Sequence, residues 1–144
     1  MLRIGDFSKL TRVQTMFDYS EIESVSFEDN NCPLLTNVQG MFQNITSLGA
    51  LDLRNFDFSH VTNMSSLFYY SKIGSLTFGD DIDTSQVTTM YEAFYNLKGV
   101  KKLDLSSWDF DSVTDIREFL SYTEIEEVKF GDINNRRSEE RRVG

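Results

Sequence analysis

One eight-residue pattern recurs five times in this 144-residue chain and constrains its fold more than any other feature. Its clearest copy runs from Val61 to Phe68, with the sequence VTNMSSLF. The other copies begin at Leu10, Leu35, Val87 and Val113. Successive starts therefore lie 25 and then 26 residues apart, a period typical of solenoids, in which each repeat is stabilised by stacking on its neighbours. We expect equivalent residues of successive repeats to lie above one another in columns. The threonine at the second position of every copy would form one such column.

The apolar residues of each copy are spaced as they are on one face of a short helix. In the third copy they are Val61, Met64, Leu67 and Phe68, at positions i, i+3, i+6 and i+7. This spacing predicts a helix of about two to three turns. Small polar residues two positions before the copies suit the N-cap of such a helix. They are Ser8, Ser59, Ser85 and Asp111.

A second apolar block separates the copies and has the alternation of a strand. In the block Leu48, Leu51 and Leu53, one polar residue separates the last two leucines, as expected for a strand with one buried face. The pattern L-x-x-L-x-L is also the strand signature of leucine-rich repeats. The sequence thus predicts an α/β fold: a leucine-rich-repeat-like solenoid of about five strand–short-helix coils, with a parallel sheet on one face.

The units also alternate between two classes. Residues 18–27, 69–78 and 121–130 resemble one another, and residues 48–62 resemble 100–114. The chain therefore contains a double repeat of about 52 residues, which duplication of a two-unit block would produce.

A column of Asp and Asn residues precedes the copies by four positions. Their side chains favour turns because they hydrogen-bond nearby backbone amides. A row of carboxylates also suits calcium, but calcium sites draw several oxygens from one tight loop. We favour turns over calcium for this column, which consists of Asp6, Asn31, Asp57, Asp83 and Asp109.

Three other positions carry specific expectations. Trp108 replaces Phe56 in the loop after the strand, and we expect it to pack between coils rather than to stack on a carbohydrate. Gly79 and Gly131 follow strands of one unit class, where we expect turns with positive φ.

Composition excludes several function classes. A net charge of −9 disfavours binding to phosphate backbones, so no nucleic-acid partner is expected. No apolar run is long enough to span a membrane. Cys32 and His60 are the only residues of their types and lie 28 positions apart, so neither a zinc site nor a catalytic pair is indicated. The sequence predicts no enzyme, no cofactor and no metal site.

The expected domain organisation is one repeat solenoid followed by a tail. Residues 1–133 form the solenoid, which we interpret as a fragment without caps at either end. Residues 134–144 break the period, have almost nothing apolar to bury and are expected to be disordered. The string from Arg137 to Gly144 resembles translated adapter sequence, so the tail is predicted to be non-native.

The run from Leu51 to Phe68, LDLRNFDFSHVTNMSSLF, closely resembles the repeat of BspA-like leucine-rich-repeat surface proteins. Their units are similar to LDLSNFDTSNVTNMSYMF, and the resemblance extends from Leu2 to Phe130. One unit class departs from it, because Phe78-Gly79-Asp80 replaces the expected LDLS-like residues. The resemblance implies a secreted or cell-surface location and adhesion to host proteins or other cells. It implies no catalytic residues.

These expectations favour a protein-interaction or adhesion module that binds a partner through its extended face. The alternatives are a structural spacer and an intracellular leucine-rich-repeat scaffold, both without enzymatic activity. The candidate face consists of outward residues on the strands, although each of them alone is also compatible with an ordinary solvated sheet surface. The residues are Ser24, Ser26, Ala50, Asp52, Ser75, Thr77, Lys102, Asp104, Glu127 and Lys129.

Overall fold

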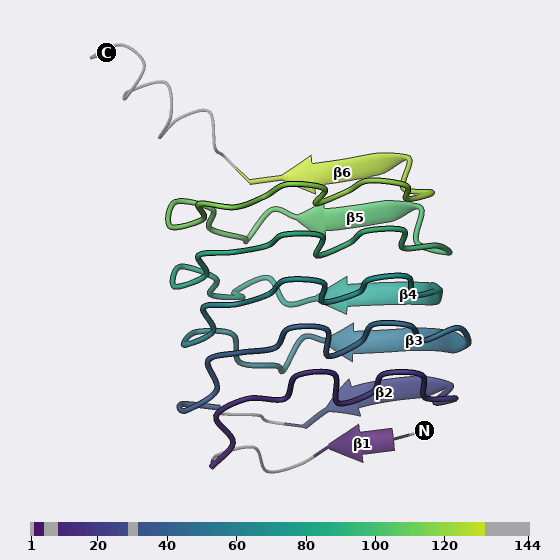
Figure 1. Cartoon of the computed structure of the whole chain (residues 1–144), viewed down its shortest axis with the longest axis horizontal. Helices are drawn as coiled ribbons and strands as arrows, with labels where there is room; N and C mark the ends of the chain where they lie inside the picture. The colour runs from purple at the N-terminus through teal and green to yellow at the C-terminus, as the bar shows by residue number, and fades with distance from the viewer. Residues whose placement is uncertain (1, 5–8, 29–31, 132–144) are drawn as a thin grey trace.

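The computed structural model describes residues 2–4, 9–28 and 32–131, and within them the backbone winds into a stack of coils (Figure 1). Each coil contributes one strand to a single row. The strands are β1 (Leu2–Ile4), β2 (Ser24–Phe27), β3 (Leu48–Leu53), β4 (Ile73–Phe78), β5 (Lys102–Leu105) and β6 (Glu127–Phe130). Paired strands are parallel, because the chain completes a circuit between one strand and the next.

Equivalent residues of successive strands lie opposite one another. Leu51 pairs with Val25 on one side and with Leu76 on the other, within the sheet β1-β2-β3-β4. Leu103 pairs with Val128 in the two-stranded sheet β5-β6. Strand β5 follows β4 in the row and contacts it, although no ladder joins the two. The predicted strand positions and their parallel stacking are confirmed.

The predicted α/β class is wrong, because the described part of the chain contains no helix and is a β-solenoid. The eight-residue copies form successive turns instead. The amide of Phe94 donates to the carbonyl of Phe119 in the next coil (3.0 Å), whereas the amide of Leu97 donates back to Phe94 (3.1 Å). Bonds between coils thus alternate with bonds within a coil, where a helix would have only i to i−4 bonds.

Two residues of each coil adopt the left-handed conformation that closes these turns. Their φ angles lie between 54° and 61°, outside the range of a right-handed helix. They form two columns, the first made of Thr15, Gly40, Ser66, Glu92 and Glu118 and the second of Tyr19, Asn44, Tyr70, Asn96 and Tyr122.

The spacing between coils explains why turns replace helices. Neighbouring strands lie about 4.8 Å apart, whereas packed helices need about 8–10 Å between their axes. Helices on one side of the stack would force it to curve. A chain of turns bonds to its neighbour at the strand spacing, and the coils stack in a straight row (Figure 1). The described residues predicted as N-caps, Ser59, Ser85 and Asp111, therefore cap no helix.

The threonine column confirms the stacking that the period predicts. The amide of Thr62 donates to the carbonyl of Thr36 (2.8 Å), and that of Thr88 to Thr62 (2.9 Å). The hydroxyl groups of Thr62 and Thr88 reach the same carbonyls at 3.2 Å. Equivalent side chains therefore lie one above another.

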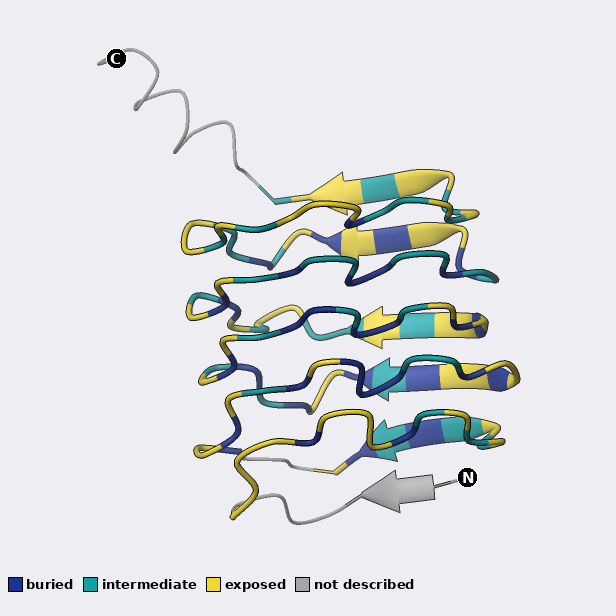
Figure 2. Ribbon diagram, in the orientation of Figure 1, coloured by how far each residue is buried: buried dark blue, intermediate teal, exposed yellow. Residues whose placement is uncertain are grey.

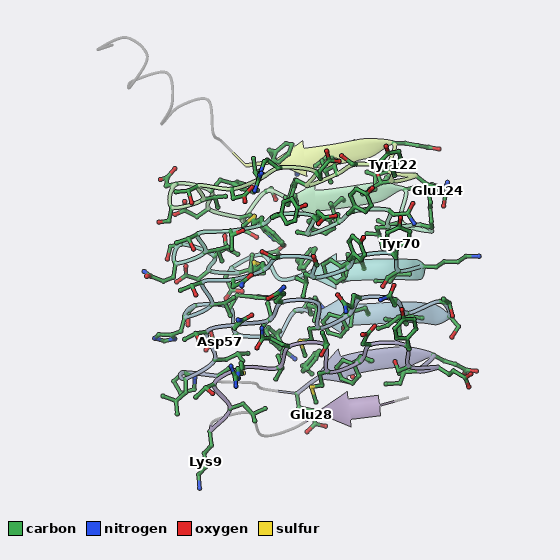
Figure 3. All side chains as sticks on the ribbon, in the orientation of Figure 1. Lys9, Glu28, Asp57, Tyr70, Tyr122 and Glu124 are labelled. Carbon is green, nitrogen blue, oxygen red and sulfur yellow. The ribbon has the colours of Figure 1, made fainter. Side chains whose placement is uncertain are left out.

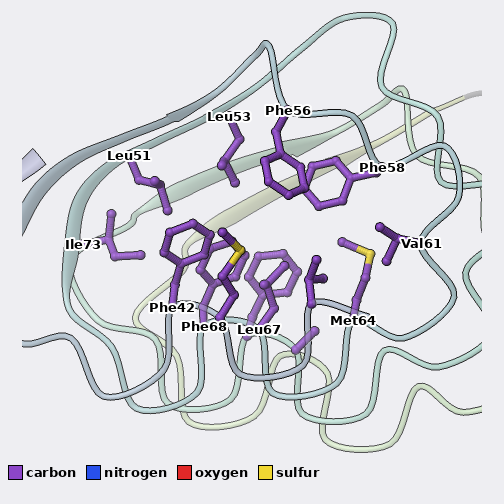
Figure 4. Packing of buried hydrophobic residues seen from close by; sticks show 14 of the residues in the cluster. Phe42, Leu51, Leu53, Phe56, Phe58, Val61, Met64, Leu67, Phe68 and Ile73 are labelled. Carbon is purple, nitrogen blue, oxygen red and sulfur yellow. The ribbon is translucent and has the colours of Figure 1, made fainter. Parts of the chain in front are cut away.

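Buried aromatic side chains form the centre of the stack (Figure 4). The rings of Phe17, Phe42, Phe68 and Phe94 stack in sequence, with centroids 5.2–5.8 Å apart. In the next coil Leu120 takes the equivalent sequence position, and the neighbouring Phe119 meets Phe94 edge-on at 5.0 Å. Each coil thus buries an aromatic ring against its neighbours.

The prediction for Trp108 is confirmed, whereas the prediction for Gly79 and Gly131 is not. Trp108 is buried and its ring lies 5.0 Å from that of Phe78, so it packs between coils as predicted. The predicted positive φ angles at Gly79 and Gly131 are not observed, so this prediction is wrong. A Cβ atom would lie 3.0 Å from the carbonyl oxygen of Arg54 at the first position and would overlap the carbonyl oxygen of Ser106 at the second. These glycines permit close approach of adjacent coils.

Some expectations lie outside the described residues. They concern Asp6, Ser8, Asn31, the boundary at 133 and the tail 134–144. Within the ranges given above, no helix has the length and apolar character needed to cross a membrane.

Candidate binding surfaces

The outward face of the strands brings the predicted face residues together. Ser24 lies opposite Ala50, which lies opposite Ser75. The same register aligns the remaining residues in rows across the strands. These rows are Ser26, Asp52 and Thr77; Lys102 and Glu127; and Asp104 and Lys129. The outward residues on β4 to β6 are exposed, whereas Ser24, Ser26 and Asp52 are half-buried (Figure 2).

The two parts of this face differ in charge. On β2 to β4 the outward residues are mainly small hydroxyl side chains, with Asp52 as the carboxylate. Two nitrogens of Arg54 bind the carboxylate of Asp52, with the closest approach at 2.7 Å. Hydrogen bonds from the Arg54 side chain lower the pKa of Asp52. This carboxylate is therefore ionised and oriented at neutral pH.

On β5 and β6 the face carries charges of both signs. The ammonium group of Lys102 lies 3.8 Å from the carboxylate of Glu127, and both side chains are mostly exposed. Such a pair contributes little to stability because water and salt screen it. Hydrogen bonds from Ser106 lower the pKa of Asp104, with a further contribution from the charge of Lys129. These groups remain available to a partner at little cost in stability.

The three described aspartates of the Asp and Asn column form turns, as the sequence predicts. In each case a carboxylate oxygen accepts a hydrogen bond from the backbone amide two residues later. The bonds join Asp57 to Ser59 (2.9 Å), Asp83 to Ser85 (2.9 Å) and Asp109 to Asp111 (2.8 Å). Among the described residues, no group of three or more His, Cys, Asp or Glu side chains is placed to hold a metal ion.

Cys32 and His60 differ in environment. Cys32 is fully buried, and its backbone amide donates to the second carboxylate oxygen of Asp57 at 3.2 Å. His60 is exposed, with its Nδ1 atom 3.1 Å from the hydroxyl of Ser59. A thiol buried in this way packs as a small hydrophobic group.

The turn side of the stack carries a tyrosine cluster that the sequence reasoning missed. We use this term for Tyr69, Tyr70, Tyr95 and Tyr122. The ring of Tyr95 is central: its centroid lies 5.2 Å from Tyr69, 5.7 Å from Tyr70 and 5.3 Å from Tyr122. Tyr70 is 47% exposed and Tyr122 68% exposed, and both lie toward the same side of the stack in Figure 3.

A signal for this cluster was present in the double repeat. Tyr19, Tyr70 and Tyr122 occupy equivalent places in alternate units, 51 and 52 residues apart. All three lie in the second left-handed column and are exposed. Because bulky residues rarely adopt positive φ, their recurrence there indicates a selected feature rather than turn chemistry alone.

Comparison with protein families identifies the repeat. A family described as "Mycoplasma protein of unknown function, DUF285" matches residues 3–73 and 36–137. No curated protein and no solved structure matches the chain. Since the two family matches together cover nearly the whole sequence, the chain belongs to the DUF285 family.

Proposed function

We propose that this chain is a protein-interaction segment of a cell-surface or secreted protein and that it binds a partner protein through the outward face of its sheet. The resemblance to BspA-like surface repeats supports the location and the adhesive role. The observation that carries the proposal is the register of the face, in which side chains from successive strands form rows on one continuous surface.

The arrangement suits recognition of a protein better than recognition of a small molecule. Five strands at about 4.8 Å spacing extend roughly 20–25 Å along the stack. A specific interface buries about 800 Å² on each partner, more than the short strands alone provide. The partner therefore also contacts the loops beside the strands. Small side chains on β2 to β4 allow close approach, and charged side chains on β5 and β6 supply orientation.

Bulky substitutions on the central strand test the face. We expect Ser75→Arg/Thr77→Arg to reduce binding of fluorescently labelled protein to intact host cells by at least about tenfold, because two long side chains block the contact surface. The matched control is Gln86→Arg/Ser112→Arg, which adds the same charge at exposed loop positions. It should bind as the parent does.

Two outcomes contradict this proposal. Equal binding by both variants and the parent would move the contact away from the sheet. Absence of binding by the parent, together with tolerance of repeat deletion in the source cell, would favour a structural spacer. Protease treatment of intact source cells tests the location, because a surface segment is digested and an intracellular one is protected.

A further inference from the structure

We propose that the tyrosine cluster is a second docking surface, and that its ligand is an extended segment of a partner protein with arginine or lysine side chains. This surface lies on the turn side of the coils and does not involve the sheet residues of the proposed function. Three observations carry the inference: the ring geometry, the surrounding charge and the repeat of the exposed rings along the stack.

The rings form one continuous aromatic surface. Tyr69 and Tyr95 stack with an interplanar angle of 18°, and Tyr70 and Tyr122 meet Tyr95 at 46° and 67°. Tyr70 and Tyr122 expose about half or more of their surface. Rigid tyrosine side chains supply large contact area at low entropic cost and are enriched among residues that dominate binding energy. An exposed cluster of them therefore indicates a binding surface.

The chain itself shows which chemical group these rings accept. On the same turn segment, the guanidinium carbon of Arg117 lies 5.1 Å from the centre of the Tyr91 ring in the preceding coil. This is a cation–π contact, in which the negative face of the ring attracts a cation. Arg117 is also held by the carboxylate of Asp115 at 2.9 Å. The contact combines an aromatic face with a nearby acid.

The tyrosine cluster also lies beside acidic side chains, and no cation–π contact from the part of the chain that the structure describes occupies its exposed rings. Burial, and after it the charge of Glu92, raise the pKa of Tyr69. Burial and the neighbouring tyrosines raise the pKa of Tyr95, with a smaller contribution from Glu118. The chain carries a net charge of −9, which attracts a basic partner over longer distances. Lys98 lies at the edge of the cluster, where its ammonium group donates to the carbonyl of Tyr122 at 2.7 Å.

The distance between the exposed rings determines the spacing of the cationic side chains along the ligand. Tyr70 and Tyr122 are two coils apart, or about 10 Å along the stack. An extended chain in the polyproline II conformation has three residues per turn and advances about 3.1 Å per residue, so every third side chain lies on one face and reaches the next exposed ring. Tyr19 continues the row one double repeat earlier. The expected ligand therefore has a cation at every third position.

A synthetic peptide tests the proposal. The probe is a fluorescein-labelled (Arg-Gly-Ser)4 peptide, and its control has the same composition with the four arginines consecutive. Fluorescence anisotropy at about 150 mM salt suppresses long-range attraction. We expect the spaced peptide to bind more tightly than the block peptide. Tyr95→Leu should weaken its binding about five- to tenfold, and Tyr95→Phe, which keeps the ring, should stay within about twofold of the parent.

Matched charge changes separate the site from general acidity. Glu92→Gln/Glu118→Gln and Asp80→Asn/Asp81→Asn each remove two negative charges, but only the first pair lies beside the cluster. We expect only the first to weaken binding substantially. Circular dichroism and the thermal midpoint must match the parent for each variant used.

Several results would overturn the inference. Parent-like binding by Tyr95→Leu, equal affinity for the two peptides, or equal loss in the two charge variants would each do so. Binding of maltoheptaose that depends on Tyr95, without binding of the peptide, would assign the surface to saccharides. The sheet variant Ser75→Arg/Thr77→Arg should still bind the peptide, so failure of the sheet proposal and failure of this one are distinguishable.

Discussion

The strand side and the turn side of the central coil contribute equally buried residues, yet they differ in how the backbone is bonded. On the strand side, Leu51 and Leu53 point inward from a regular parallel strand. On the turn side, Met64 and Phe68 are just as buried but belong to successive turns. Sequence periodicity located both sets of core residues and described the backbone correctly on only one side.

The difference shows what an apolar spacing reports. Positions i, i+3, i+6 and i+7 face one side of a helix, and they also face one side of a chain of tight turns. The spacing therefore identifies the side chains that become buried, because the free energy gained on burial depends on the apolar surface area of each side chain. It does not identify the hydrogen-bond partners of the amides, which here alternate between a residue about 25 positions away in a neighbouring coil and one three positions earlier.

Truncation of one core residue on each side should have the largest effect. We expect Phe68→Ala to lower the free energy of unfolding by about 3–5 kcal/mol and Leu51→Ala by about 2–5 kcal/mol, because each leaves a cavity between coils. Urea unfolding followed by circular dichroism measures both. The exposed control Ser75→Ala should change stability by less than about 0.5 kcal/mol. A parent-like Phe68→Ala would mean that the turn side is not part of the cooperative core.

A glycine substitution distinguishes turns from a helix by the sign of its effect. Ser66 has a φ of 54°, and relief of left-handed strain is worth about 1–2 kcal/mol. This exceeds the unfolded-state entropy cost of glycine, about 0.5–1 kcal/mol. We therefore expect Ser66→Gly to stabilise the protein by about 0.5–1 kcal/mol. In a helix the same change would destabilise by a similar amount.

Ser121 is the control for that experiment. Ser121 does not have a positive φ angle, so Ser121→Gly should destabilise the protein. Loss of stability in both variants would contradict the turn assignment.

A pH titration should show the smallest effect. Hydrogen bonds from Ser85 lower the pKa of Asp83 in the folded chain, below the value of about 3.9 expected when unfolded. Stabilisation from this group is therefore present above about pH 4 and is lost as the pH falls through the folded pKa. Asp83→Asn keeps an acceptor oxygen but does not titrate. We expect the parent's advantage in thermal midpoint over this variant to shrink between about pH 5 and pH 2, and a constant difference would contradict the prediction.

Much of the candidate surface was predictable, and the rest depended on contacts between coils. The outward row from Ser24 to Lys129 followed from strand alternation, because successive side chains of a strand point to opposite faces. The tyrosine cluster did not follow from any single unit. Tyr95 and Tyr122 come from different unit classes, and their meeting depends on the stacking of neighbouring coils. Arg117 meets Tyr91 for the same reason.

The sequence by itself determined the period, the columns and the core residues of the central coils, since these depend on side-chain chemistry repeated at a constant interval. At equivalent positions of the end coils, Leu10 and Ile116 are exposed because fewer neighbours cover them. Only the tertiary structure decided the path of the backbone on the turn side. A coil that must bond to its neighbour at the spacing of parallel strands has no room for a helix. The same stacking placed Phe119 in the aromatic column of the core and gathered tyrosines from successive coils into one exposed surface.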